Sequence, residues 1–528
     1  MKARCLAFVL LAAGIPFGRT AIGATLEPLT HQPPAYVGPN QPFLLTDGSV
    51  LFQDDSFTGF WKLTPDAAGG YLDGTWTKVA SLPSAWNYGP YAYASAVLAD
   101  GRVLIEGGEY NLGGPFSLTN QGAIYDPVAD SWTEAAPPPG WDYIGDASSI
   151  VMPNGKFLLG NKLDQRIAEL DPATMTWTAL GSAGADEDFN AEEGWTLLPD
   201  GTFITVDVFA APMTKRYTYT DAENAGSWTS LGATQGSLAW DYNKPPIIFP
   251  GGSYVPPGET GQCMLMPGTT VFCTGASDDQ PAHPAHTAIL DTTTMTWGTG
   301  PDFPPGDDAG DTSAVLLPNG NVLVSATSGQ LYEFDGGTLA PTLSAGTPAR
   351  LIVLPSGEVL VNGFDVELYT PDDTNPHPLA IAQIIDLPFF LIPGNTYRVI
   401  GYQLNGISQA QAFGDEIQAP TNYPLVRLTG SGGDVHYART HDHSSMGVQT
   451  GFSNTVWTWF DVPADMQAGT YRIETVANGV PSNHTCIRVL SADAIFADPF
   501  ELCAPFGAAC AYRIRVPKRD DRRRERRR

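Results

Sequence analysis

Basic residues are scarce in most of this chain, and the formal net charge of −28 understates the shortage. Residues 24–512 hold 15 Lys or Arg against 53 Asp or Glu, whereas residues 513–528 alone hold ten Lys or Arg. Proteins that bind nucleic acids neutralise phosphates with Lys and Arg, which so acidic a body cannot do. We therefore expect no nucleic-acid partner.

Cysteine is also scarce, with six residues and no Cys-x-x-Cys pair of the kind that holds zinc. Cys263 and Cys273 lie symmetrically about a Pro-Gly turn in CMLMPGTTVFC, so we expect a cross-strand disulfide. Cys503 and Cys510 could close a small loop, which would leave Cys486 as a lone, buried thiol. Such disulfides are typical of oxidising compartments.

Long hydrophobic runs are absent beyond the N-terminus, so we expect no membrane span. Residues 1–23 combine a basic start, an apolar run and small residues near the end, which is typical of a secretory signal peptide. We expect a secreted or periplasmic monomer. Residues 491–528 form a tail that is basic at its end and is expected to be disordered there.

Glycine and proline, in contrast, are abundant, and many of them belong to a repeat. Seven times an apolar segment leads into a short turn that ends in Gly and then into a second apolar strand, as in VLADGRVLI and LLPNGNVLV. Asp-Gly and Asn-Gly favour hairpins because Gly accepts a positive φ. The turn glycines are Gly48, Gly101, Gly155, Gly201, Gly268, Gly320 and Gly357.

Most of these units end in a second signature, as in IYDPVADSWT and ELDPATMTWT, whose tryptophan we expect to pack between neighbouring blades. The recurrence and its kelch-like period fit four-stranded propeller blades. The sequence therefore predicts an all-β fold with a seven-bladed kelch-type β-propeller over residues 24–375. The seventh unit is short, and a strand near ATLEPLTHQ is expected to complete it and close the ring.

Residues 376–490 contain short runs of alternating apolar residues, which are typical of a seven-stranded β-sandwich. Their segment WTWFDVPADMQAGTYRIETVANGVPSNHTCIRV resembles the C-terminal domain of the galactose oxidase-like family. Proteins of that family join a seven-bladed kelch-type propeller to an immunoglobulin-like (early set) β-sandwich. The resemblance extends over nearly the whole chain from residue 24 to about residue 490.

The same resemblance locates the copper ligands of galactose oxidase, which uses two tyrosines, two histidines and a cysteine joined to one tyrosine. Its cysteine falls near Pro39, its cross-linked tyrosine at Ala92, and its Tyr-His pair at Thr347 and Pro348. A copper-radical site needs a redox-active side chain on the metal and several nitrogen ligands. We therefore expect no copper-radical cofactor, while Ca²⁺ or Cu²⁺ held in another way stays open.

Carboxylates occupy the corresponding position of other repeats, eight residues before the turn residue. If the register holds, they point into one axial cavity together with a counter-charge. They could hold Ca²⁺, bind sugar hydroxyls, or simply be solvated loop charges, which are common in acidic chains. The candidate binding residues are Asp146, Glu192, Glu193, Asp311, Tyr93 and Arg350.

Histidines gather in the sandwich sequence DVHYARTHDHSSMG. The resemblance implies that His441 reaches under the propeller as a metal ligand, with His443 and Arg439 as further candidate catalytic residues. Alternatively, these groups form a hydrogen-bonded network between the two domains. In either case we expect residues 439–444 to pack against the propeller with His441 nearest its axis.

Two functions follow as hypotheses. The first is an exported binding or structural protein whose acidic propeller presents a site for an extracellular carbohydrate or protein. The second is a metal-dependent, carbohydrate-active oxidoreductase related to galactose oxidase, with altered metal chemistry. The missing cysteine and Tyr-His pair favour the first hypothesis.

Overall fold

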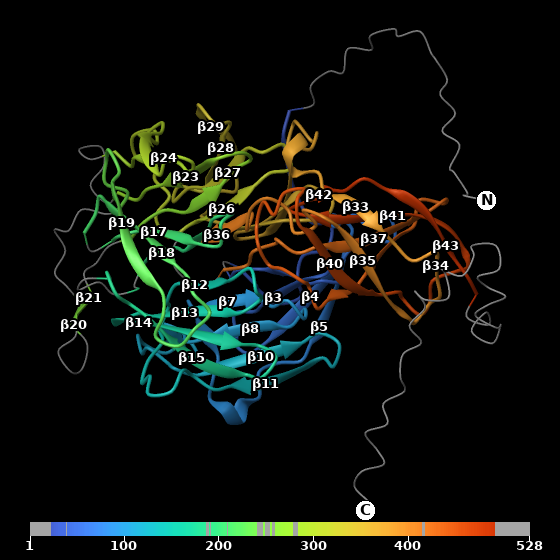
Figure 1. The fold of residues 1–528 in the computed structure, drawn as a ribbon, viewed down its shortest axis with the longest axis horizontal. Helices are drawn as coiled ribbons and strands as arrows, with labels where there is room; N and C mark the ends of the chain where they lie inside the picture. The colour runs from blue at the N-terminus through green and yellow to red at the C-terminus, as the bar shows by residue number, and fades with distance from the viewer. Residues whose placement is uncertain are drawn as a thin grey trace, which may run out of the picture.

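The computed structural model describes residues 23–38, 40–185, 190, 192–208, 210–239, 247–248, 254–255, 259–277, 284–413 and 418–491. In this part of the chain nearly every regular element is a strand, apart from the short 3₁₀ turns η1 (Ser84–Trp86) and η2 (Pro378–Ala380) (Figure 1). No helix within these ranges is long and apolar enough to cross a membrane. The expected signal segment and basic tail lie almost wholly outside the described residues.

Seven four-stranded antiparallel sheets follow one another along the described chain and form the blades of a β-propeller (Figure 1). Blade 1 consists of β2 (Phe43–Leu44), β3 (Val50–Gln53), β4 (Phe60–Thr64) and β5 (Thr75–Val79). Blade 2 consists of β7 (Ala94–Val97), β8 (Val103–Glu106), β10 (Gly122–Asp126) and β11 (Ser131–Ala135). Blade 3 consists of β12 (Ser149–Val151), β13 (Phe157–Asn161), β14 (Asp164–Asp171) and β15 (Thr176–Leu180).

The remaining blades repeat this arrangement, and first strands are innermost, because those of neighbouring blades contact one another, as β22 and β26 do. Blades 4 to 7 consist of β16 (Thr196–Leu197), β17 (Phe203–Val206), β18 (Met213–Thr218), β19 (Ser227–Ala233); β22 (Cys263–Leu265), β23 (Thr270–Thr274), β24 (Thr287–Asp291), β25 (Thr296–Thr299); β26 (Ser313–Leu316), β27 (Val322–Ser325), β28 (Gln330–Phe334), β29 (Leu339–Ser344); β30 (Arg350–Val353), β31 (Val359–Asn362), β32 (Val366–Thr370) and β1 (Thr25–Pro28).

Two short ribbons lie between blade strands. They are formed by β6 (Pro90–Tyr91) with β9 (Tyr110–Asn111), and by β20 (Ile247–Ile248) with β21 (Tyr254–Val255).

The predicted glycine turns join the first and second strands of every blade. All seven turn glycines have φ between 80° and 95°, a conformation that costs Gly little because it has no Cβ. In blade 2 the N–H of Gly101 donates to the carbonyl of Leu98 at 2.9 Å, which closes the hairpin. The repeat of seven hairpins predicted from the sequence is therefore confirmed.

Tryptophans of the second signature connect neighbouring blades, as expected. The indole N–H of Trp132 in blade 2 donates to the carbonyl of Ala80 at 2.8 Å, just after the last strand of blade 1. The indole of Trp297 in blade 5 donates to Thr214 of blade 4, also at 2.8 Å. Each ring thus contributes apolar area and one directed bond to the seam between two blades.

Ring closure also follows the prediction. The N-terminal strand β1 pairs antiparallel with β32, from Thr25 opposite Thr370 to Pro28 opposite Glu367, and supplies the outer strand of blade 7. The first and last parts of the propeller sequence therefore share one sheet.

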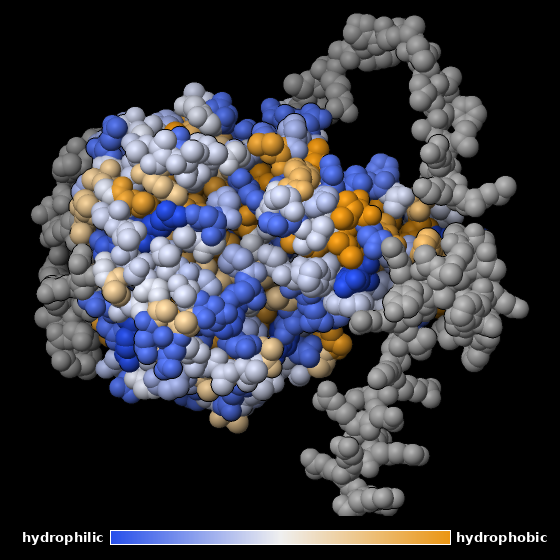
Figure 2. Space-filling view, viewed as in Figure 1, coloured by the Kyte–Doolittle hydropathy of each residue, from blue (hydrophilic) through white to orange (hydrophobic). Residues whose placement is uncertain are grey.

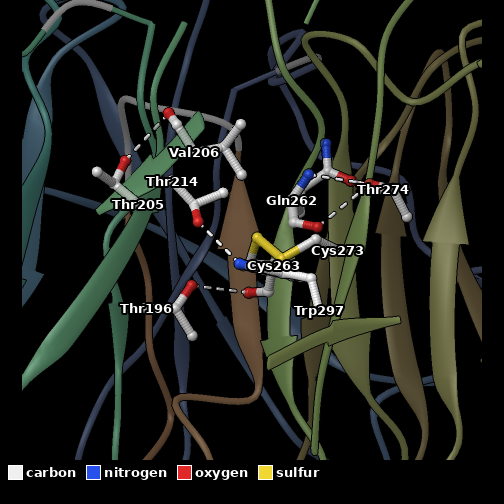
Figure 3. Close-up of a disulfide and its surroundings, with 9 residues drawn as sticks. All are labelled: Thr196, Thr205, Val206, Thr214, Gln262, Cys263, Cys273, Thr274 and Trp297. Atoms are coloured by element: carbon white, nitrogen blue, oxygen red, sulfur yellow. Dashed lines mark hydrogen bonds between the residues drawn. A yellow bond between two sulfur atoms is a disulfide. The ribbon is translucent and has the colours of Figure 1, made fainter. Parts of the chain in front are cut away.

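The cysteines gave one correct and one wrong expectation. Cys263 and Cys273 face each other in β22 and β23 and form the predicted disulfide, with Cα atoms 4.0 Å apart (Figure 3). Cys486 is disulfide-bonded and exposed, so the expectation of a lone, buried thiol is wrong. The alternation of its strand turns Cys486 to solvent while Ile487 enters the core. Cys503 and Cys510 lie outside the described residues.

The C-terminal region forms two sheets that share one apolar core (Figure 1). One core layer comes from Val399 and Phe460, and the facing layer from Leu428 and Ile473, so the two sheets make a sandwich. Their strands are β33 (Gln383–Asp386), β35 (Thr396–Tyr402), β40 (Thr455–Asp461), β39 (Thr440–His441); β34 (Phe390–Leu391), β43 (Thr485–Val489), β41 (Gly469–Ala477), β37 (Leu425–Gly430), β38 (Val435–Ala438) and β42 (Val480–Pro481).

A segment of the C-terminal region also enters the propeller. We call residues 403–413 and 418–422 the axial insert. Its strand β36 (Gln411–Phe413) pairs antiparallel with β26 and adds a fifth strand to blade 6, inside the innermost one. Other blades hold it as well, because Leu197 donates to Gln409 at 2.9 Å and Ser95 donates to the carbonyl of Gln418 at 3.0 Å.

The two faces of the ring therefore differ. On the face where the glycine turns lie, which we call the turn face, the C-terminal region contacts the turns of several blades, including blade 7 through Arg427 and blade 5 through Gln449. There Thr440, His443 and Met446 each donate a backbone hydrogen bond of 3.0 Å to a turn carbonyl of a different blade. On the opposite face, the cavity face, the first strands begin. Figure 2 shows polar side chains over most of the propeller and broader apolar areas over the sandwich.

Candidate functional site

A cavity of about 430 Å³ opens on the cavity face. Its walls come from loops that precede the first strands of several blades and from loops after the second strands of blades 6 and 7. Aromatic side chains and charged groups meet in it, namely Tyr36, Tyr91, Phe364, Glu259, Asp311 and Arg350. Because these loops belong to repeats far apart in the sequence, the cavity exists only in the closed ring.

The aromatic side chains form an exposed wall. Phe364 is 71% exposed and Tyr36 is 44% exposed, and their ring centroids lie 6.2 Å apart. On the other side, the small ribbon β6–β9 places Tyr91 opposite Tyr110, with ring centroids 6.1 Å apart. Exposed rings at the mouth of a concave site offer flat apolar surfaces to a ligand.

A buried lysine gathers the carboxylates next to this cavity. The ammonium of Lys162, which is 1% exposed, lies 2.5 Å from Asp146 and 2.6 Å from Glu192. A carboxylate oxygen of Glu109 lies 4.0 Å away. Asp311 interacts electrostatically with both Lys162 and Glu192, which connects this cluster to the cavity wall. We call Glu109, Asp146, Lys162 and Glu192 the Lys162 cluster.

Burial perturbs the carboxyl groups here. It raises the pKa of Asp146 well above its usual value, and the nearby Lys162 ammonium offsets only part of that rise. Burial likewise raises the pKa of Glu109, against the opposing effect of Lys162. For Asp311, burial raises the pKa while Arg350 lowers it. Perturbed carboxyl groups that converge in a cleft are typical of functional sites.

Three non-glycine residues with a positive φ lie at the starts of first strands on this face. Ala92, Glu192 and Asp311 occupy the same repeat position in three blades, and their φ values are 52°, 58° and 52°. This left-handed conformation is energetically unfavourable for a residue with a Cβ, and residues that adopt it are often found at ligand sites. The repeat thus turns these three residues in a common way at the start of their first strands.

The structure unites four of the six predicted binding residues. Asp311 and Arg350 line the cavity, whereas Asp146 and Glu192 meet at Lys162 and are linked to Asp311 by electrostatic interaction only. Arg350 also donates to the carbonyl of Asp311 at 3.0 Å.

Two predicted binding residues lie elsewhere. Glu193 is buried and accepts hydrogen bonds from Thr205 at 3.1 Å and from the Val208 N–H at 3.3 Å. Tyr93 is fully buried and donates to Gln53 at 3.1 Å. Glu193 lies one position after Glu192, which contacts Lys162, and Tyr93 lies two positions after Tyr91, which lines the cavity.

Sequence reasoning missed Lys162 and Glu109. Lys162 follows β13 in the sequence LLGNKL, where a lysine resembles ordinary surface charge. Glu109 follows the glycine pair after β8. A signal was available in hindsight, because each residue lies within three positions of the end of a second strand, and second strands end on the cavity face.

The donor set does not fit a copper-radical centre. Thr347 and Pro348 line the cavity where the resemblance placed a Tyr-His pair, and no imidazole is among its described lining residues. Pro39 lies outside the described residues. Copper in such centres needs nitrogen ligands and a redox-active side chain, whereas this wall supplies carboxylate, guanidinium and hydroxyl groups.

A calcium site finds no support in the arrangement either. Throughout the ranges described, no group of three His, Cys, Asp or Glu side chains is placed to hold a metal ion. The carboxylates of Asp146 and Glu192 instead meet the ammonium of Lys162. The positive charge that Ca²⁺ would supply is thus provided by the protein itself.

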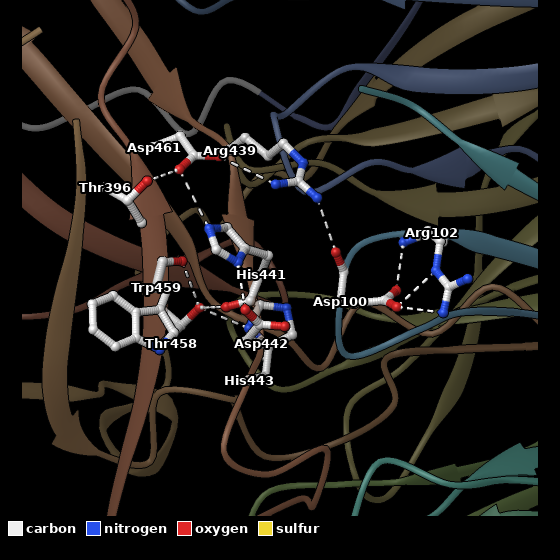
Figure 4. A network of polar contacts seen from close by, with 10 residues as sticks. All are labelled: Asp100, Arg102, Thr396, Arg439, His441, Asp442, His443, Thr458, Trp459 and Asp461. Carbon is white, nitrogen blue, oxygen red and sulfur yellow. Dashed lines mark hydrogen bonds and ion pairs between the residues drawn. The ribbon is translucent and has the colours of Figure 1, made fainter. Parts of the chain in front are cut away.

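The histidines lie on the turn face, in a network of ion pairs and hydrogen bonds (Figure 4). The His441 ring lies between two carboxylates, 2.9 Å from Asp442 and 3.3 Å from Asp461, which help to raise its pKa to about 9 against the effect of burial. Arg439 contacts the same Asp461 at 3.2 Å and donates to the carbonyl of Asp100 in blade 2 at 3.0 Å.

His443 has the opposite environment. It is buried, its ring nitrogen lies 2.8 Å from the Thr458 hydroxyl, and it stacks on Tyr423 with centroids 5.9 Å apart. Burial lowers its pKa to about 3, so the ring is neutral. The loop packs against the propeller, but the element that enters the ring is the axial insert, so the expectation that His441 lies nearest the axis is not met.

Comparisons with known proteins agree with a kelch-like propeller. A segment of 131 residues is 28% identical to Kelch-like protein terF of Aspergillus terreus. The matched segment covers 24% of this chain and 26% of that protein. The chain thus spans about a quarter of the length of the curated relative it matches. No family model matches the chain.

Solved structures share low identity with the chain. A novel fungal alcohol oxidase of the AA5 family, in complex with copper, is 13% identical, with 88% of this chain and 98% of that chain covered at a TM-score of 0.47. A catalytically inactive virginiamycin B lyase from Staphylococcus aureus with quinupristin is 11% identical, with 66% and 97% covered at a TM-score of 0.42.

Proposed function

We propose that this protein is an exported, carbohydrate-binding kelch propeller that takes its ligand in the axial cavity and performs no copper-radical chemistry. In this proposal residues 1–23 are an export signal, residues 24–375 the propeller, residues 376–490 an early set domain of the galactose oxidase-like type, and residues 491–528 a tail. The protein acts as a monomer.

The observation that carries the proposal is the composition of the cavity wall. Exposed aromatic rings stand beside the carboxyl groups of Glu259 and Asp311 and the guanidinium of Arg350 in a concave space of about 430 Å³. Sugars have apolar C–H faces that pack on such rings and hydroxyls that donate to carboxylates. A few convergent polar groups on an apolar wall are the usual features of a small-ligand site.

A protein ligand fits this site less well. The polar groups line a concave space of about 430 Å³, which a sugar ring enters more readily than the broad surface of a folded partner does. Protein–protein interfaces generally bury far larger and flatter areas than such a cavity offers.

Binding of neutral oligosaccharides, measured by calorimetry, tests the proposal. Phe364→Ala should weaken binding about fivefold, because one stacked ring is worth about 1 kcal/mol. Phe452→Ala is the matched control, since Phe452 is also an exposed aromatic residue but belongs to the sandwich. An absence of binding to every sugar tested, or equal binding by the Phe364→Ala variant, would contradict the proposal.

Metal analysis separates this function from the oxidoreductase alternative. The purified protein should contain neither copper nor calcium in stoichiometric amount, and copper-loaded protein should release no peroxide from galactose or other primary alcohols. Stoichiometric copper together with peroxide release would favour the oxidoreductase.

A further inference from the structure

We infer that a second pocket, which lies between the sandwich and blades 1 and 7, binds a small carboxylate. Its volume of about 370 Å³ is within the usual range for small-ligand sites. Because this pocket lies on the turn face, the inference goes beyond the proposed function and does not depend on it. We call it the turn-face pocket.

Three neighbouring strands of the sandwich form one wall of the turn-face pocket. Arg427 and Thr429 are two positions apart in β37, so both point to the same side of the sheet. The strand register places Thr429 between Val435 of β38 and Arg472 of β41. Tyr437 of β38 lies opposite Arg427, and all five residues line the pocket.

The propeller supplies the other wall. It consists of residues 68–70, in the loop between β4 and β5 of blade 1, and of Ser356 in the turn of blade 7. The N–H of Val435 donates to the carbonyl of Ala67 at 2.8 Å and joins the sandwich to the loop of blade 1. The pocket therefore exists only where the two domains meet.

Positive charge in the turn-face pocket is the first reason for the inference. Its charged side chains, among the described lining residues, are Arg427 and Arg472 alone, in a body where residues 24–512 hold 53 acidic residues against 15 basic ones. Glu474 contacts both, at 2.9 Å and 3.1 Å, so two guanidinium groups share one carboxylate. The side chain of Arg472 is 45% exposed, which leaves several of its five N–H donors for a ligand.

Nearby carboxylates narrow the class of anion. Asp66 accepts the N–H groups of Ala68 and Gly70 at 2.8 Å and 2.9 Å. Asp434 lies 3.2 Å from the ring of His436. Neither carboxylate is among the described lining residues, but both lower the positive potential around the pocket. We therefore expect a singly charged carboxylate, whose two oxygens match a guanidinium group, rather than a multiply charged phosphate.

An unsatisfied hydroxyl is the second, independent reason. Oγ1 of Thr429 is buried and has no hydrogen-bond partner among the described residues, although the residue as a whole is only partly buried. Rotation about the Cα–Cβ bond moves the hydroxyl between staggered positions, so it can turn towards a ligand in the pocket. A carboxylate held by Arg472 would accept its hydrogen, because Thr429 and Arg472 lie directly opposite each other on neighbouring strands.

Ligand-observed NMR titration with two small molecules of the same size tests the inference. Succinamate carries one carboxylate, and succinamide is its neutral counterpart. At pH 7 and low salt, succinamate should bind at least about tenfold more tightly than succinamide, and the advantage should shrink in high salt. Inorganic phosphate should bind more weakly than succinamate.

Arg472→Gln is the informative variant. It should weaken succinamate binding about tenfold, whereas folding should persist because Glu474 keeps its contact with Arg427. Arg398→Gln is the matched control, since it removes the same charge from an exposed position in β35 of the other sandwich sheet. This control should leave the affinity for succinamate unchanged.

Thr429→Val separates a binding role from a structural one. Val keeps the shape of the side chain but lacks the hydroxyl, so succinamate binding should weaken about threefold. The urea midpoint of the free protein should not fall, because the hydroxyl has no partner to lose. A lower midpoint with unchanged affinity would overturn the role given to this hydroxyl.

The remaining outcomes decide the inference itself. It is overturned if succinamate does not bind, if succinamide or phosphate binds as tightly, or if Arg472→Gln and Arg398→Gln behave alike. Loss of succinamate binding in Phe364→Ala instead of Arg472→Gln would move the anion to the axial cavity and would also overturn it. A preference for succinamate that Arg472→Gln removes, and that both Arg398→Gln and Phe364→Ala retain, supports the inference.

Discussion

The two faces of the propeller use the ends of the same repeat in different ways. On the turn face, charges meet opposite charges: His441 lies between Asp442 and Asp461, and Arg439 joins Asp461 to blade 2. On the cavity face, Lys162 lies among the carboxylates of Asp146, Glu192 and Glu109, and burial raises the pKa of Asp146. The sandwich therefore pairs with charged groups of the turn face, whereas on the cavity face charged groups line an open cavity.

The same contrast is seen in the backbone. The turns between the first and second blade strands place glycines such as Gly101 and Gly201 at positive φ, which they adopt at little cost. At the start of three first strands the positive φ angles belong to Ala92, Glu192 and Asp311, which have a Cβ. The turn face also holds a non-glycine residue of this kind, because Asp442 has a φ of 51°.

Removing the charge of Lys162 should lower the unfolding free energy more than any other change considered below. Lys162→Met leaves the carboxylates of Asp146 and Glu192 buried without a counter-charge, so unfolding free energy at pH 7 should fall by about 3 to 5 kcal/mol. Urea denaturation of the wild type and the variant measures this difference in unfolding free energy. At pH 4 the loss should shrink, because the carboxyl groups can then be protonated.

Lys78→Met serves as the control on the surface, where Lys78 lies 5.7 Å from the ring of Trp61, and it should cost about 1 kcal/mol at most. Equal losses for the two variants would show that the Lys162 cluster is no more demanding than the surface.

Removing hydrogen bonds of the axial insert should lower the unfolding free energy by an intermediate amount. Gln411 of the axial insert is buried, donates to Gln41 at 3.0 Å and accepts from the Ala419 N–H at 2.7 Å. Gln411→Ala leaves these partners unpaired and should cost about 1 to 3 kcal/mol in urea denaturation. Gln467→Ala, in an exposed part of the sandwich, should cost less than about 0.5 kcal/mol. A negligible loss of unfolding free energy in both variants would mean that these hydrogen bonds of the axial insert do not stabilise its contact with the propeller.

The histidines of the turn face should give the smallest effect, which depends on pH. The pKa of His441 is raised to about 9, so its stabilisation is full below about pH 6.5 and is lost as pH rises through 9. The pKa of His443 is lowered to about 3, so stability falls as pH drops below about 6.5, because only the unfolded chain gains that proton. Together they predict a stability maximum near pH 6.5.

Single variants separate the two limbs. His441→Gln should flatten the alkaline limb and His443→Gln the acid limb, each by about 1 to 2 kcal/mol in urea midpoints converted to free energy. Wild-type stability that stays constant from pH 6.5 to 9 would show that the carboxylates do not hold the His441 proton.

Features that recur along the sequence could be predicted from it, whereas features that occur only once could not. Hairpin turns and inter-blade tryptophans recur, so their register also located Asp146, Glu192 and Asp311. Lys162 is a single residue at one strand end, and no periodicity distinguishes it from surface charge. The axial insert was missed because β36 is three residues long and pairs with a strand about a hundred residues earlier, which no local pattern records.

Ring closure has a consequence for how the chain folds. β1 and its partner β32 are about 340 residues apart in sequence, so blade 7 lacks its outer strand until the whole propeller has been synthesised. Contacts this distant in sequence slow folding, because loop-closure entropy must be overcome before the pairing stabilises anything. Loss of only residues 25–28 by a protease would reopen the ring at blade 7, so resistance to aminopeptidases should report closure.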